Sequence, residues 1–81
     1  MLQIIDVEYL GNHSLEIHFD NGDEGVVDFT KILKGKVYEP LKDVDLFKQY
    51  GLKNGTLEWV NGADFAPEFL HKNLSPKLVK A

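Results

Sequence analysis

The chain has no cysteine and no arginine, and each absence excludes or disfavours a class of function. Without cysteine there are no disulfides and there is no thiol chemistry. All nine basic residues are lysines, and thirteen acidic residues bring the net charge to -4. Proteins that bind nucleic acid usually present a cationic surface to the phosphates and use arginine to recognise bases. This composition therefore disfavours direct binding to nucleic acid.

Long apolar runs are also missing from the sequence. No run approaches the roughly 18 residues that suggest a membrane span, so we expect no membrane contact. No basic stretch precedes an apolar segment at the start of the chain, so we expect no signal peptide and a cytoplasmic protein. The 81 residues, 43% of them hydrophobic, suffice for one domain with one core. We expect this domain in residues 1–74 and a flexible C-terminal tail in residues 75–81.

Residues 3–29 alternate between apolar and polar side chains with turn residues between, which predicts a three-stranded antiparallel meander. In the second turn, a three-residue loop pairs Leu15 with Val27. A two-residue loop would instead pair Leu15 with Asp28 and place a carboxylate on the apolar face. We therefore predict the longer loop, with a positive φ at Gly22. The same alternation predicts the pairs of the first turn, Tyr9 with Leu15 and Val7 with Ile17.

Two short helices are predicted in the middle of the chain. Asp28 is placed to cap the first, which covers Phe29–Leu33, and Asp43 is placed to start the second, which Gly51 ends. Between them Val37–Leu41 is predicted to be extended, because a residue that precedes proline avoids the helical region. The second helix is expected to turn three side chains inward, Leu46, Phe47 and Tyr50.

A short strand, Thr56–Trp59, contains the only tryptophan of the chain. The pair Asn61-Gly62 ends this strand, because both residues tolerate a positive φ. A helix is predicted to follow and to pack an apolar face back onto the strand, with Trp59 as a buried anchor of the contact. The residues of that face are Phe65, Phe69 and Leu70.

The start of this last helix has three signals. Asp64 is placed to cap it, and Pro67 falls in its first turn, where a missing N–H costs nothing. Glu68 lies near the positive end of the helix dipole. We therefore predict an α+β fold, in which an antiparallel β-meander and a fourth strand form one small sheet. The C-terminal helix and two short helices are predicted to cover one face of that sheet.

Three groups of motifs, taken in order, resemble the bacterial family called domain of unknown function 2442, over roughly residues 3–72. The resemblance implies a small α+β domain without an established activity, and it supplies no catalytic residue. Some members of the family carry an appended helix-turn-helix, for which this chain has no room. Others are encoded beside another small family, which implies toxin–antitoxin-like pairs. The motifs are Phe19–Asp23 with Val27–Phe29, Val37–Leu41 with Leu46-Phe47, and Gly55–Trp59 through Asn61–Asp64 to Pro67-Glu68.

Motifs for metals and cofactors are weak. The histidines at positions 13, 18 and 71 lack the spacing of metal ligands, so we interpret them as surface residues. The acidic turn Asp20–Glu24 resembles part of a calcium loop, but the twelfth position holds Lys31 instead of the required glutamate. No glycine-rich phosphate loop occurs. We therefore expect no metal and no cofactor.

One surface remains as a candidate site, and three functions remain open for the chain. The carboxylates of Asp64 and Glu68, near Trp59, suit an acid/base pair in a small pocket. Alternatively, they only cap the helix and complement its dipole. The first hypothesis is a non-enzymatic module that binds another protein, such as the product of a neighbouring gene, in an antitoxin-like pair; a homo-oligomer formed through a sheet edge is also open. The others are a small-molecule-binding or enzymatic domain, and a DNA-associated regulator. The residues of the surface are Trp59, Asn61, Gly62, Asp64, Pro67 and Glu68.

Overall fold

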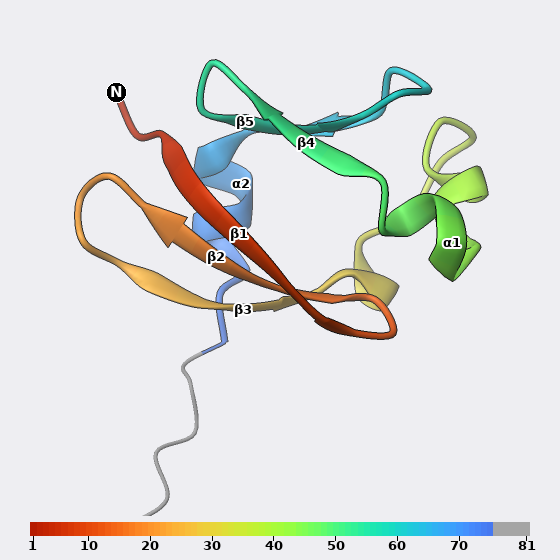
Figure 1. Ribbon diagram of the computed structural model, residues 1–81, viewed down its shortest axis with the longest axis horizontal. Coiled ribbons are helices and arrows are strands. Elements are labelled where there is room, and N and C mark those ends of the chain that lie inside the picture. The colour runs from red at the N-terminus through yellow and green to blue at the C-terminus, as the bar shows by residue number, and fades with distance from the viewer. Residues whose placement is uncertain (76–81) are drawn as a thin grey trace, which may run out of the picture.

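The chain forms two antiparallel three-stranded sheets and several short helices, so the predicted α+β class is confirmed (Figure 1). The structure, a computed structural model, describes residues 1–75, and the predicted tail from residue 76 on lies outside the described residues. The strands are β1 (Ile4–Gly11), β2 (Ser14–Phe19), β3 (Glu24–Asp28), β4 (Tyr50–Lys53), β5 (Thr56–Trp59) and β6 (Asp64–Phe65). The helices are η1 (Phe29–Lys31), η2 (Glu39–Lys42), α1 (Val44–Phe47) and α2 (Pro67–Lys72).

The first sheet, in the order β1-β2-β3, has the predicted register. Leu15 pairs with Val27 across the second turn and with Tyr9 across the first. Gly22 has a φ of +91°, and its N–H donates to the carbonyl of Phe19 at 3.1 Å. Glycine adopts this conformation at little cost because it has no Cβ. The three-residue loop is therefore confirmed, and Leu15, Ile17, Phe19 and Val27 are buried on the core side of the sheet.

The prediction of a single four-stranded sheet is wrong, because β5 pairs with two strands of its own. In β4, Tyr50 lies opposite Trp59, and the turn residues Asn54-Gly55 have φ values of 53° and 77°. Two positive φ values in a two-residue turn match the right-handed twist of an antiparallel hairpin. On the other side, β6 places Phe65 opposite Leu57. These two local pairings occupy both edges of β5, which leaves none for the first sheet.

Both predicted helix caps in the middle of the chain are confirmed. At the start of η1, the Asp28 side chain accepts a hydrogen bond from the N–H of Thr30 at 3.0 Å. At the start of α1, the Asp43 side chain accepts from the N–H of Asp45 at 2.9 Å. In both places a carboxylate satisfies a backbone donor that the first turn of a helix leaves without a partner.

Two other predictions for this segment are wrong. Val37–Leu41 is not extended throughout, because η2 covers Glu39–Lys42 and has its proline at the beginning, where no N–H is needed. Gly51 does not end a helix, because α1 already ends at Phe47 and Gly51 lies in β4. Of the α1 side chains expected to point inward, Phe47 is buried, whereas Leu46 is 38% exposed.

Helix α2 starts at Pro67, so the prediction that Asp64 caps it is wrong. Ala66 precedes proline and keeps an extended backbone, with φ -64° and ψ 143°, which delays the start of the helix. Asp64 instead lies in β6, opposite Glu58 in β5. Glu68 is in the first turn of the helix, as predicted.

Trp59 is buried in the hydrophobic core, as predicted. Its indole N–H donates to the carbonyl of Phe47 at 2.8 Å, and its ring contacts Phe29 and Phe65 edge-on. The prediction that the last helix supplies the aromatic side of this contact is wrong. Phe65 belongs to β6, and Phe69, on α2, is 41% exposed. The tryptophan therefore joins α1, η1 and the second sheet rather than strand and C-terminal helix.

The outer edge of the first sheet contacts the segment that follows α2. The N–H of Val26 donates to the carbonyl of Ser75 at 3.1 Å, and the N–H of Ser75 donates back at 2.7 Å. Ser75, the first residue of the predicted tail, is therefore paired with β3. A Cβ added at Gly25 would lie 2.9 Å from the Ser75 carbonyl oxygen, so the close approach depends on glycine. Association of copies through a sheet edge stays a prediction.

Candidate functional site

An open cleft of about 560 Å³ lies between three parts of the chain, namely the end of η1 with the segment that follows it, β6, and α2. We call it the aromatic–lysine cleft, and its defining residues come from distant parts of the sequence. None of them belongs to the first sheet. Its volume is in the range of about 300–1,000 Å³ that is usual for ligand sites. The residues that define it are Lys31, Lys34, Tyr38, Asp64, Phe65 and Phe69.

Three aromatic rings form a stack along this cleft. The rings of Tyr38 and Phe65 are 4.7 Å apart between centroids and inclined by 18°. Those of Phe65 and Phe69 are 5.7 Å apart and inclined by 10°. Phe65 is buried in the middle, whereas Phe69 is 41% exposed. The stack thus connects the core, through the contact of Phe65 with Trp59, to an aromatic surface open to solvent.

Hydrogen bonds from the second sheet hold the position of Tyr38. Its hydroxyl donates to the backbone carbonyl of Asp64 at 2.8 Å. The side-chain amide of Asn61 donates to the carbonyl of Val37 at 3.0 Å and accepts from the N–H of Ala63 at 3.2 Å. Gly62, with a φ of +92°, completes this turn. The turn between β5 and β6 therefore fixes the wall of the cleft.

The ionisable groups of the cleft have different surroundings. Burial, and then the charge of Asp64, raise the pKa of Tyr38, so its hydroxyl stays protonated and continues to donate at neutral pH. Lys31 and Lys34 have no ion pair with any residue in 1–75. The cleft thus presents two cations and one exposed carboxylate beside an aromatic surface.

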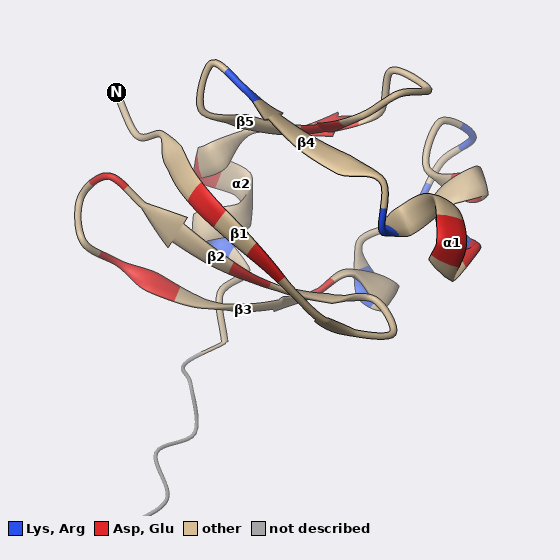
Figure 2. Cartoon of the chain, in the orientation of Figure 1, with Lys and Arg blue, Asp and Glu red and all other residues tan. Residues whose placement is uncertain are grey.

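Charge is unevenly distributed along the chain. None of the nine lysines precedes position 31, and Figure 2 shows acidic but no basic residues along β1, β2 and β3. Lys31 and Lys34 are therefore the first cations in the sequence, and they lie beside the cleft. The first sheet carries most of the negative charge of the first thirty residues, Asp6, Glu8, Glu16, Glu24 and Asp28, with Asp20 and Asp23 in its second turn.

The structure separates the candidate residues that the sequence singles out. Asp64 lines the cleft, but Trp59 and Glu68 do not, so these three do not surround one cavity. The indole N–H of Trp59 is already bonded in the core, and Pro67 is buried. Asn61 and Gly62 act at a distance, through the turn that holds the 37–38 segment. Of the candidate surface, only Asp64 lines the cleft.

The patterns of the sequence do not indicate four of the cleft residues. Lys31, Lys34 and Tyr38 lie in a segment whose pattern predicts only a helix and a connection, and Phe69 is expected to be buried. The lysines that closely precede an aromatic residue are a local signal for this segment. The contact of Tyr38 with β6 depends on long-range packing, which no local pattern reports.

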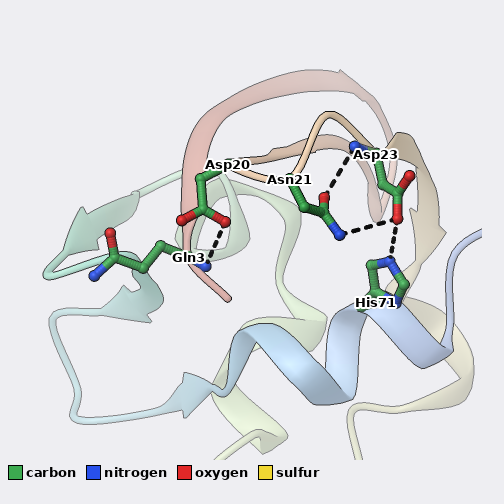
Figure 3. A network of polar contacts seen from close by, with 5 residues as sticks. All are labelled: Gln3, Asp20, Asn21, Asp23 and His71. Carbon is green, nitrogen blue, oxygen red and sulfur yellow. Dashed lines mark hydrogen bonds and ion pairs between the residues drawn. The ribbon is translucent and has the colours of Figure 1, made fainter. Parts of the chain in front are cut away.

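A second polar cluster joins the turn between β2 and β3 to α2 (Figure 3). The Asp23 carboxylate lies 2.7 Å from Nε2 of His71 and also accepts from the side-chain amide of Asn21. The hydrogen bond with His71 is the main cause of a lowered pKa of Asp23. In the same turn, Asp20 accepts from the N–H of Gln3 at 3.1 Å. The cluster ties three segments together at the surface.

Two other kinds of feature are absent from the described part of the chain. Residues 1–75 contain no group of three or more histidine, aspartate or glutamate side chains placed to hold a metal ion. No helix in this part of the chain is long and apolar enough to cross a membrane.

Comparison with known proteins gives one finding. No curated protein and no solved structure matches the chain. The model of one family, described as protein of unknown function (DUF2442), matches residues 4–74. This range includes all the strands and helices described above. The chain therefore belongs to the DUF2442 family, as its motifs indicate.

Proposed function

We propose that the protein is a non-enzymatic interaction module that binds another protein through the aromatic–lysine cleft. The observation that carries this proposal is the exposure of Phe69, 41%, at the end of a three-ring stack. Aromatic side chains are the residues that most often dominate the binding energy of protein interfaces. An aromatic ring that is partly open to solvent beside a cleft is therefore suited to a partner's side chain.

The cleft is also held in place before any partner arrives. The Tyr38 hydroxyl is bonded to Asp64, and the middle ring of the stack is buried against the core. Ordering of side chains on binding costs about 0.5–1.5 kcal/mol for each one that is immobilised. Two walls that are already fixed reduce this cost.

The polar groups near the cleft have structural partners. The Tyr38 hydroxyl donates its proton to a backbone carbonyl and its pKa is raised, and the Trp59 N–H donates to another. We therefore assign the tyrosine the role of a neutral aromatic wall. The pairing with the product of a neighbouring gene, in an antitoxin-like way, is supported by the family resemblance alone.

The test is co-expression with the product of the adjacent gene, followed by affinity measurement on the purified complex. Phe69→Ala is expected to weaken binding by about tenfold or more, since it removes the exposed ring. Ile5→Ala is the matched control, because Ile5 is 61% exposed, lies in β1 and does not line the cleft. Recovery of no specific partner would count against the module, and equal loss in both variants would count against the cleft.

A second candidate is the binding of a small molecule in the same cleft, which its volume of about 560 Å³ favours. The only tryptophan contacts Phe65, so ligand binding is expected to change its fluorescence. A ligand that shifts Trp59 emission in the wild type but not in Phe69→Ala would support this candidate. A library of metabolites without any such ligand would oppose it.

A further inference from the structure

We infer that the aromatic–lysine cleft recognises an acidic segment of the partner protein, with an aromatic side chain next to its carboxylates. This inference rests on the proposed function, because it gives the chemistry of the partner that the module binds. The aromatic side chain lies against the exposed ring of Phe69, and the carboxylates face Lys31 and Lys34.

The charge of the cleft carries the first step. Lys42 already pairs with Glu39 at 3.2 Å, but Lys31 and Lys34 have no ion pair among residues 1–75. Lys31 is near enough to Asp28 to contribute to its lowered pKa. However, Oδ1 of Asp28 already accepts hydrogen bonds from both the N–H and the hydroxyl of Thr30. The two ammonium groups are therefore available to carboxylates from outside.

The rest of the surface restricts where an acidic segment binds. The first sheet carries acidic residues and no lysine, so it repels carboxylates (Figure 2). The cleft combines two cations with an apolar ring, and the combination selects a segment that has both features. Repulsion between the carboxylates of the partner and those of the first sheet disfavours binding of the segment there.

The extent of the apolar surface favours a peptide over a small aromatic acid. Val37, which precedes Tyr38, is 44% exposed. Val60, which precedes Asn61, is 85% exposed, and the Asn61 side chain donates to the carbonyl of Val37. Both segments that build the wall therefore have an exposed apolar side chain outside the residues that line the cleft. A peptide chain can cover them, whereas a single ring with one carboxylate cannot.

Asp64 is the one cleft residue that opposes this ligand. Its carboxylate is exposed, and it also lies opposite Glu58 in the neighbouring strand. Asp64→Asn keeps the backbone carbonyl that holds Tyr38 but removes the negative charge. The affinity for an acidic segment is expected to rise by about two- to fivefold in this variant, in the range of one exposed charge pair.

The experiment is calorimetric titration of the full chain with a ten-residue peptide, in which one phenylalanine lies between aspartates and glutamates. Two control peptides replace the acidic residues by lysines or the phenylalanine by alanine, and free phenylacetate is the small-molecule control. The acidic aromatic peptide is expected to bind most tightly. Equal binding of the lysine peptide, absence of peptide binding, or binding of phenylacetate as tight as that of the peptide would overturn the inference.

Variants of the chain complete the test. The double variant Lys31→Glu, Lys34→Glu is expected to weaken binding of the acidic peptide by about tenfold, while Lys53→Glu in β4 leaves it within about twofold. The same variants are measured with the natural partner. If the partner binds the wild type and both lysine variants equally, the acidic segment is wrong and the interaction module stands. If no partner is found but the acidic peptide binds as described, the proposed module fails and the specificity of the cleft stands.

Discussion

The indole of Trp59 connects parts of the chain that no sheet joins. It is 4% exposed, contacts Phe29 and Phe65, and donates to the carbonyl of Phe47. A buried aromatic side chain contributes through its area, and its N–H also needs a partner. At the residue scale, this one side chain therefore fills space in the core and has a hydrogen-bond acceptor for its N–H.

Trp59→Ala is expected to lower the free energy of unfolding by about 3–5 kcal/mol, because it removes the ring and leaves a cavity. A domain of this length has about 4–12 kcal/mol in total, so the variant loses a large share of its stability. Urea unfolding followed by far-UV circular dichroism measures the loss. Val60→Ala, at an exposed site, is the control, and an unchanged free energy of unfolding in Trp59→Ala would contradict the core role.

Two aspartates make stability depend on pH in the acid range. Asp23, bonded to His71, and Asp28, bonded to Thr30, both have pKa values lowered from the ordinary 3.8. The folded state therefore binds these protons less readily than the unfolded state does. Their contribution to stability is complete above about pH 4 and is lost as the pH falls through the lowered values.

Urea unfolding between about pH 6 and about pH 2.5 measures this dependence. Asp28→Asn keeps a side chain that can cap η1 but does not titrate, so it is expected to flatten the acid limb of the profile. Asp6→Asn is the control, since the Asp6 side chain bonds to the N–H of the next residue only. A profile that is equally steep in Asp28→Asn and the wild type would refute the contribution of Asp28.

At the scale of elements, the turn between β5 and β6 builds one wall of the cleft. Asn61 bonds to the carbonyl of Val37, and Gly62 has a φ of +92° with no atom within 4 Å of the position that a Cβ would take. An alanine there would therefore meet no neighbour, but it would force a residue with a Cβ into the left-handed region. The cost of that conformation is about 1–2 kcal/mol.

Gly62→Ala is thus expected to lower stability by about 1–2 kcal/mol and to weaken partner binding, because the turn also holds Tyr38. Gly51→Ala in β4 is the matched control, since space is also open there and no positive φ is required. Thermal unfolding and the affinity for the partner are the two measurements. A destabilised variant with unchanged affinity would separate the turn from the cleft.

The elements also show which features a sequence reports. The register of the first sheet is predictable because alternation and a glycine turn are local. Strand β4 is not among the predicted strands, although Asn54-Gly55, which follows it, is a hairpin signal. Strand β6 has two residues, too few for any alternation. The helix start is displaced because Ala66 precedes a proline and therefore stays extended, a restriction that the sequence prediction considers only before Pro40.

At the scale of the whole molecule, the acidic sheet and the exposed aromatic ring lie on different parts of the fold. The first sheet carries acidic residues and no lysine, whereas the cleft combines two lysines with an exposed ring. A partner with carboxylates is therefore repelled by one part of the surface and attracted by another. The cleft itself is not predictable from local patterns, because it joins residues 31–38 to residues 64–69 through tertiary packing alone.

The most direct measurement of the central claim is a map of amide chemical shifts of the labelled protein, recorded as the partner or the acidic peptide is added. We expect the largest changes at the cleft residues, with Phe69 and Lys34 among them, and small changes along β1–β3. Large changes confined to the first sheet, with none around Phe69, would contradict binding at the cleft.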